Sequence, residues 1–249
     1  MINKQLVLNY YWRIKWGFRK YYKFLKSKVI STNKAKYFES QPTDSEIIIS
    51  PGEKYELTIT SHSTKKGCWN YSRGIVKNLS NNQIIADVKR NYSDFIYAWA
   101  ENHKNGHDYL ICGENYQGQT IIELDTGKRK DHLPINAFNG GGFCWSNIKP
   151  SPDQSKLAVV GCYWGAPYDL VFFDFSKPLS LPFKELSVYD APSDFIWIDN
   201  NSGEAVVTKE IRISDGKLMN DLEDEEQLKA YEKHDSKEIQ EHSIIKAIK

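Results

Sequence analysis

The chain has 249 residues, of which 40% are hydrophobic, 26% charged and 13% aromatic, and this composition excludes disorder of the whole chain. The formal net charge of +1 gives no global electrostatic reason to expect nucleic acid or a membrane surface as a partner. Cysteines stand at Cys68, Cys112, Cys144 and Cys162, with no C-x-x-C pair and no compact framework. We therefore expect reduced thiols and a cytoplasmic protein.

Residues 1–45 are predicted to form a basic, aromatic, amphipathic helix followed by a linker. Residues 1–40 hold ten Lys or Arg against the single Glu39. Apolar side chains recur at steps of three and four, which places them on one stripe of a helix. The stripe consists of Val7, Tyr11, Ile14, Phe18, Tyr21 and Leu25. Residues 6–12 are too short and too polar for a secretory or membrane-spanning segment.

Two interpretations of this helix stay open. In the first, its apolar stripe packs on the rest of the chain. In the second, it is an interaction helix whose Trp12, Trp16, Arg19 and Lys23 suit an acidic protein or anionic headgroups.

Residues 46–216 are predicted to form a β repeat domain, because short apolar strands alternate with turn residues and no helical period intrudes. Trp99, Trp145 and Trp197 each open a unit of about fifty residues. A polar turn, an apolar strand and a third strand follow each of them in the same order. A divergent copy begins near Ser50 and adds a further strand at 82–88, which makes four strands, the number in a propeller blade.

One copy carries a specific resemblance. Trp145-Ser146, then residues 151–158 (SPDQSKLA), then residues 169–174 (DLVFFD) resemble the TolB-type and WD-like β-propeller repeat. The match is good in residues 143–176 and partial in the other units, and Gln154 stands where that repeat usually has Gly. The resemblance implies a mainly β, propeller-like stack of about four blade-like antiparallel sheets. It implies no activity, because propellers serve as enzymes, binders and scaffolds.

Residues 217–249 are predicted to form a charged helical tail. Glu223, Asp224, Glu225 and Glu226 suit the first turn of one helix. Asp235, with a Glu three residues later, predicts a second helix.

Motifs that would identify a catalytic or metal centre are weak. His103 and His107 lie in a Gly-containing turn, where their spacing does not align them, and no nucleophile elbow is present. We predict no metal, no cofactor and no catalytic residue. A carboxylate pair from distant loops remains an alternative, drawn from Asp169, Asp174, Asp190, Asp194 and Asp199.

The most distinctive local feature is a pair of aromatic connections at corresponding places in two units. The candidate binding residues in them are Trp69, Tyr71, Arg73, Tyr163, Trp164 and Tyr168. Trp, Tyr and Arg dominate binding hot spots, so we expect a non-enzymatic, intracellular protein-binding module, a class that includes inhibitor and immunity-type proteins. Two alternatives are a hydrolase or sugar-acting enzyme with its site in a central depression, and a peripheral membrane adaptor. A homo-oligomer that completes the ring also stays open, and nucleic acid is not expected.

Overall fold

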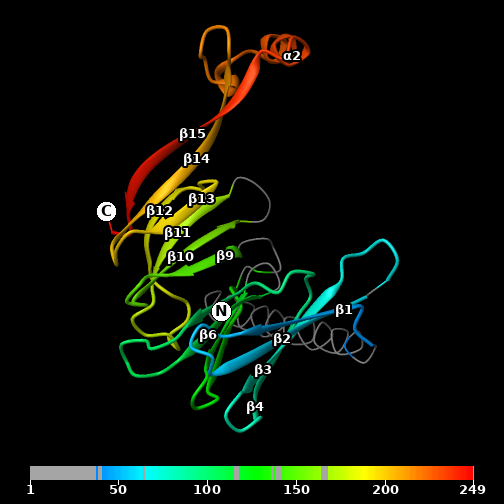
Figure 1. The fold of residues 1–249 in the computed structure, drawn as a ribbon, viewed down its shortest axis with the longest axis vertical. Helices are drawn as coiled ribbons and strands as arrows, with labels where there is room; N and C mark the ends of the chain where they lie inside the picture. The colour runs from blue at the N-terminus through cyan, green and yellow to red at the C-terminus, as the bar shows by residue number, and fades with distance from the viewer. Residues whose placement is uncertain are drawn as a thin grey trace, which may run out of the picture.

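The computed structural model describes Phe38, residues 41–63, 65–114, 118–135, Ala137, and residues 142–163 and 168–248. The predicted N-terminal helix lies outside these residues. Within them the chain forms four antiparallel sheets, which follow one another in sequence (Figure 1). The prediction of a mainly β fold with about four antiparallel sheets is therefore confirmed.

Three of the sheets are four-stranded meanders, in which each strand pairs with the next one along the chain. The first consists of β1 (Asp44–Ile49), β2 (Tyr55–His62), β3 (Tyr71–Asn78) and β4 (Ile84–Arg90). The second consists of β5 (Tyr97–Ala100), β6 (Tyr109–Glu114), β7 (Gly118–Glu123) and β8 (Arg129–His132). The third consists of β9 (Cys144–Pro150), β10 (Lys156–Cys162), β11 (Asp169–Asp174) and β12 (Glu185–Asp190).

The fourth sheet has three strands, and it corrects the sequence analysis twice. It consists of β13 (Asp194–Trp197), β14 (Ser202–Arg212) and β15 (Ser236–Lys246). Residues 204–214 look like two short strands in sequence, but β14 runs straight through them because no turn residue separates Lys209 from Glu210. The second predicted tail helix is wrong: residues 236–246 pair with the whole of β14. That pairing extends over all eleven residues of both strands.

The helical part of the tail is confirmed only for its first half. The 3₁₀ turn η2 (Met219–Asp221) and the helix α2 (Asp224–Glu232) connect β14 to β15. Figure 1 shows β14 and β15 extending away from the other sheets and carrying α2 at their far end. No helix in the described part of the chain is long and apolar enough to cross a bilayer.

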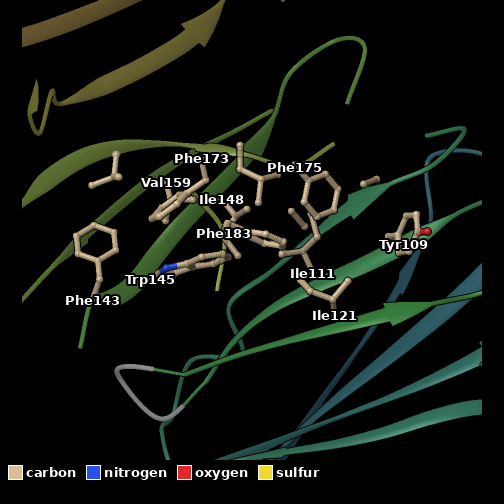
Figure 2. Packing of buried hydrophobic residues seen from close by; sticks show 14 residues of the cluster. Tyr109, Ile111, Ile121, Phe143, Trp145, Ile148, Val159, Phe173, Phe175 and Phe183 are labelled. Carbon is tan, nitrogen blue, oxygen red and sulfur yellow. The ribbon is translucent and has the colours of Figure 1, made fainter. Parts of the chain in front are cut away.

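The sheets are held together by alternate side chains that enter different cores. Along a strand, successive side chains point to opposite faces. In β7, Ile121 packs between the second and third sheets, whereas Ile122 packs between the first and second. Figure 2 shows the core between the second and third sheets, with Tyr109 and Ile111 on one side and Trp145 and Phe173 on the other. The two middle sheets are thus buried on both faces.

A second set of contacts joins the turns between the first two strands of neighbouring sheets. In the first turn, the Gly52 amide donates to the Glu101 carboxylate at 2.5 Å. The Gln154 side chain, from the third turn, donates to the carbonyl of Glu101. The Asp153 amide donates to Asn200 Oδ1 of the fourth turn at 2.9 Å. One line of hydrogen bonds therefore connects all four turns.

Asp108 anchors this line between the first and second sheets. Its buried carboxylate accepts hydrogen bonds from Lys54 Nζ at 2.9 Å, from the Tyr55 hydroxyl at 3.0 Å and from the Asn102 amide at 2.7 Å. Burial by itself raises the pKa of Asp108, but these three hydrogen bonds outweigh burial and hold the pKa below its ordinary value.

We expect Asp108→Asn to lower the free energy of unfolding by about 1–3 kcal/mol at neutral pH, because three donors lose a charged acceptor. Urea unfolding measures the loss. The matched control is Asp87→Asn, since Asp87 forms an exposed ion pair with Arg73 at 2.9 Å. The control should cost about 1 kcal/mol or less.

The difference in the free energy of unfolding between the wild type and Asp108→Asn should become smaller at acidic pH. A carboxyl group whose folded pKa is depressed adds stability above its unfolded pKa, and this stability is lost as the pH falls through the folded pKa. The unfolded pKa of Asp is about 3.9, so the narrowing should begin near that pH and continue below it. A difference that stays constant down to pH of about 3 would contradict the role given to the charge.

Candidate functional site

The candidate site begins at the connection between β10 and β11, where the chain is rich in aromatic residues. Tyr163 and Tyr168 lie at its two ends and are 50% and 48% exposed. Trp164 lies outside the described residues. The ring of Tyr163 packs on Phe143 with 5.0 Å between the ring centroids, and its hydroxyl donates to Glu185 at 3.4 Å.

Gly161 allows this connection to leave the sheet. The register of β10 against β9 shifts between Val160 and Gly161. A side-chain carbon at Gly161 would collide with the carbonyl oxygen of Cys144 and would lie 2.9 Å from the ring of Phe143. Only glycine leaves room for this close approach of two backbones.

Tyr168 also lines a cavity of about 320 Å³ between the third and fourth sheets. The walls combine apolar side chains with a few polar groups and come from β9, β10, β11, β13 and the segments beside them. They are Ser146, Asn147, Lys149, Ala158, Val160, Tyr168, Leu170, Pro192, Ser193, Asp194 and Phe195. A concave site with a few convergent polar groups is the usual form of a ligand or peptide pocket.

Lys149 and Asp194 form the charged side of the cavity. Lys149 Nζ contacts Asp194 Oδ1 at 2.9 Å and donates to the Phe195 carbonyl at 2.6 Å. The hydrogen bond from Lys149, together with that from the Phe195 amide, lowers the pKa of Asp194 below its ordinary value. The carbonyl of Lys149 accepts from the Trp197 indole at 2.9 Å. These bonds fix β13 against β9 along one wall.

The pKa of the Tyr168 phenol lies above its ordinary value. Its neighbour Cys162 raises its pKa most, followed by burial, and Tyr92 and Cys144 add smaller effects. A hydrogen bond between the Tyr168 hydroxyl and the Cys162 side chain contributes to this shift, so Tyr168 stays protonated at neutral pH.

In the first sheet, the connection between β2 and β3 corresponds to the one between β10 and β11. It contacts the residues that follow β4. Trp69 is 53% exposed, and its indole donates to the carbonyl of Asn91 at 2.8 Å. Tyr92, the next residue, is one of the groups that act on Tyr168. The carbonyl of Tyr92 accepts from Ser72 Oγ at 2.8 Å. Trp69 therefore contacts residue 91, and the neighbouring Tyr92 exerts a small electrostatic effect on Tyr168.

Tyr71 and Arg73 make different contacts. Both belong to β3, where they alternate with the buried residues Ser72 and Gly74. Tyr71 packs on Phe38, with 6.1 Å between the ring centroids. Arg73 donates two hydrogen bonds, each 2.9 Å long, to the carboxylate of Asp87. The predicted interaction helix residues Trp12, Trp16, Arg19 and Lys23 lie outside the described residues.

The carboxylates considered as a catalytic pair serve turns and strand pairing where their contacts are described. Asp199 accepts from the amides of Asn201 and Ser202, and Asp174 accepts from the Ser176 amide. Within the described part of the chain, no group of three or more His, Cys, Asp or Glu residues could hold a metal ion. Sequence reasoning missed Lys149, Ser193 and Asp194 as a group, because no motif links two segments 45 residues apart.

Gly161→Ala should destabilise the fold by about 2–3 kcal/mol, because backbone atoms must move to admit the new methyl group. Gly113→Ala is the matched control, since its nearest neighbours would lie 3.3 Å away. It should cost about 1 kcal/mol or less, as small adjustments suffice there. Thermal and urea unfolding of both variants check this, and equal losses would show that Gly161 is not needed for the close approach.

Comparison with known proteins identifies one relative but no activity. No family model matches the chain. In the solved structures, the β-propeller domain of the Trilobed protease from Pyrococcus furiosus, which has an open velcro topology, is similar with a TM-score of 0.41 and 12% identity. The match covers 68% of this chain, and the chain spans 50% of that one.

The sequence comparison gives a stronger similarity. "Uncharacterized protein R762" of Acanthamoeba polyphaga mimivirus is 35% identical over 187 residues, which cover 70% of this chain and 72% of the relative. The chain therefore belongs to the same protein family as this mimivirus protein.

Proposed function

We propose that the chain is a protein-binding module and that its binding surface is the aromatic rim formed by Trp69, Tyr163 and Tyr168 together with the adjoining cavity. One observation carries the proposal: Tyr163 and Tyr168 stand about half exposed at the two ends of one connection, and Tyr168 lines the adjoining cavity. A monomeric surface rarely leaves such residues together without a partner, and Tyr and Trp contribute most of the energy at protein interfaces.

The chemistry of the cavity supports binding over hydrolysis. Among the described lining residues the only carboxylate is Asp194, and Lys149 holds it in an ion pair. A hydrolase needs a second acid or base within reach of the same substrate atom. The remaining polar groups of the lining are the Asn147 side chain and the hydroxyls of Ser146 and Ser193, which donate to the Val160 carbonyl and to the Thr208 hydroxyl. This mixture suits a segment of polypeptide with one or two apolar side chains.

The proposal includes a propeller-like arrangement and a cytoplasmic location. Support for the arrangement is the meander order of three consecutive sheets and the cores between neighbouring sheets, since both are features of propeller blades. Support for the location is that all four cysteines are free thiols, as in proteins of reducing compartments. We propose that the four sheets form an open stack. Within the described residues, no further sheet closes this stack into a ring.

A partner captured from the native host should lose affinity when the rim is truncated. We expect Tyr168→Ala and Trp69→Ala each to raise the Kd of the purified complex at least tenfold, because buried aromatic anchors contribute about 2 kcal/mol or more. Isothermal titration calorimetry with the purified partner measures the change.

Tyr231→Ala is the matched control, because Tyr231 is a similarly exposed tyrosine on α2, far from the rim along the chain. The control should leave the Kd unchanged. The assignment of the surface is refuted if Tyr231→Ala weakens the complex while Tyr168→Ala and Trp69→Ala do not. A fluorescence-detected hydrolysis screen of peptide and glycoside substrates tests the enzyme alternative on the same preparations.

A further inference from the structure

Two of the cysteines lie directly opposite one another on neighbouring strands of the third sheet. Cys144 is the first residue of β9, Cys162 is the last residue of β10, and the two are partners in the antiparallel register. The Cα atoms of such partners lie about 4.5–5.5 Å apart, within the range of about 4.4–6.8 Å that a disulfide spans. Both residues stand as thiols in the structure. The backbone therefore holds two thiols where a disulfide can form between them.

Both side chains project toward the fourth sheet. On β10, Val159 enters the core with the second sheet, whereas Ala158 and Val160 line the cavity. The register shift skips a residue of β9, so the alternation along β10 is not interrupted, and Cys162 points to the same side as Ala158 and Val160. Cys144, as its direct partner, points the same way. The two thiols therefore share the cavity side of the third sheet.

The two backbones also approach each other closely at this point. The carbonyl oxygen of Cys144 occupies the space in which Gly161, the neighbour of Cys162, would carry a side chain. A disulfide requires its two β carbons to lie about 3.5–4.5 Å apart, which is closer than most opposite pairs in a sheet. The close approach at Gly161 favours this short distance.

The two thiols differ in their access to solvent. Cys144 is partly buried, whereas Cys162 is only 6% exposed. A reagent in solution therefore reaches Cys144 first, and Cys162 is placed to react with whatever forms there. The other two cysteines lack this arrangement. Cys112 is buried and its strand partners are not cysteines, and Cys68 is exposed in the connection between β2 and β3.

Tyr168 links this pair to the binding surface. A hydrogen bond joins the Tyr168 hydroxyl to the Cys162 side chain, and Cys144 exerts a smaller electrostatic effect on the same phenol. Tyr168 also lines the cavity. A sulfur atom in a disulfide carries no hydrogen and is drawn toward its bonded partner, so a bond to Cys144 removes the Cys162 thiol from Tyr168. A chemical change at the two sulfur atoms therefore acts directly on one residue of the aromatic rim.

We propose that Cys144 and Cys162 are a reversible disulfide site that regulates the aromatic rim; the regulation, though not the bond, rests on the proposed binding function. The oxidant is a small disulfide, RS–SR. The Cys144 thiolate attacks one of its sulfur atoms, and the RS⁻ that leaves takes up the proton lost by Cys144. The Cys162 thiolate then attacks the Cys144 sulfur and displaces the second RS⁻, which takes up the proton of Cys162. Two protein thiols are thus oxidised to one disulfide, and RS–SR is reduced to two RSH.

Peptide mapping of the folded full chain tests the bond. The chain is treated with oxidised glutathione, its remaining thiols are alkylated, and trypsin then cuts after Lys156, which separates the two cysteines. We expect a disulfide-linked pair of peptides that a thiol reductant converts back to the single peptides. Cys144→Ser and Cys162→Ser should each abolish the linked pair. The matched control, Cys68→Ser, removes an exposed thiol and should leave the linked pair unchanged.

Calorimetric titration with the purified partner tests the regulation. Oxidation should raise the Kd of the wild type about fivefold, because a hydrogen bond that orients Tyr168 is lost, and reduction should restore the Kd. Cys144→Ser cannot form the bond and keeps the Cys162 thiol, so its Kd should be the same with and without the oxidant. Cys68→Ser should respond as the wild type does, which separates the effect from modification of the exposed thiol.

The disulfide is refuted if the folded wild type gives no linked peptides under conditions that attach glutathione to Cys68. Linked peptides that form only in urea refute it as well, because the folded strands then do not bring the thiols together. An unchanged Kd after complete linkage overturns the regulation. Failure of the proposed function is a separate result: if Tyr168→Ala leaves the Kd of the complex unchanged, the linked peptides should still form.

Discussion

The alternation of side chains along each strand is the constraint on which the rest of the structure depends. A strand that is buried on both faces sends successive side chains into two different cores. In β11, Val171 and Phe173 enter the core with the second sheet, whereas Leu170 and Phe172 enter the core with the fourth. A sheet in the middle of the stack therefore needs almost continuous apolar strands. A sheet at the end of the stack needs them on one face only.

The line of hydrogen-bonded turns follows from this stacking. When sheets stack face to face, the turns between their first and second strands come side by side, and their polar groups must be satisfied by one another or by water. Gln154 meets part of this requirement: its Nε2 donates to the Glu101 carbonyl, whereas its Oε1 is buried with no hydrogen-bond partner among the described residues. It occupies a left-handed conformation with φ of 58°, where the related repeat pattern usually has glycine. An L-residue there costs about 1 kcal/mol, and the hydrogen bond from its side chain to Glu101 offsets this cost.

The sequence was sufficient to predict the repeated sheet units and their apolar strands. Trp99, Trp145 and Trp197 do lie in the first strands of three successive sheets, β5, β9 and β13. The outer strands β8 and β12 were not predicted, since RKDH is short and charged and ELSVYD mixes apolar with charged and polar residues. The strand β15 was assigned to a helix because its isoleucines are read equally well at either period. Residues 236–246 form a strand because they pair with β14, and a local sequence pattern does not reveal a pairing partner.

The position of the cavity follows from the same packing, although no sequence pattern predicts it. The core between the second and third sheets is filled by large rings, including Phe143, Trp145 and Phe173. Between the third and fourth sheets, three of the six buried residues are alanines, namely Ala158, Ala205 and Ala247. Small side chains fill less of the space between sheets set by their larger neighbours, and Ala158 is itself in the cavity wall. Tyr168 leads from the aromatic rim into this space. The cavity is therefore a consequence of how the third sheet divides its large and small side chains between its faces.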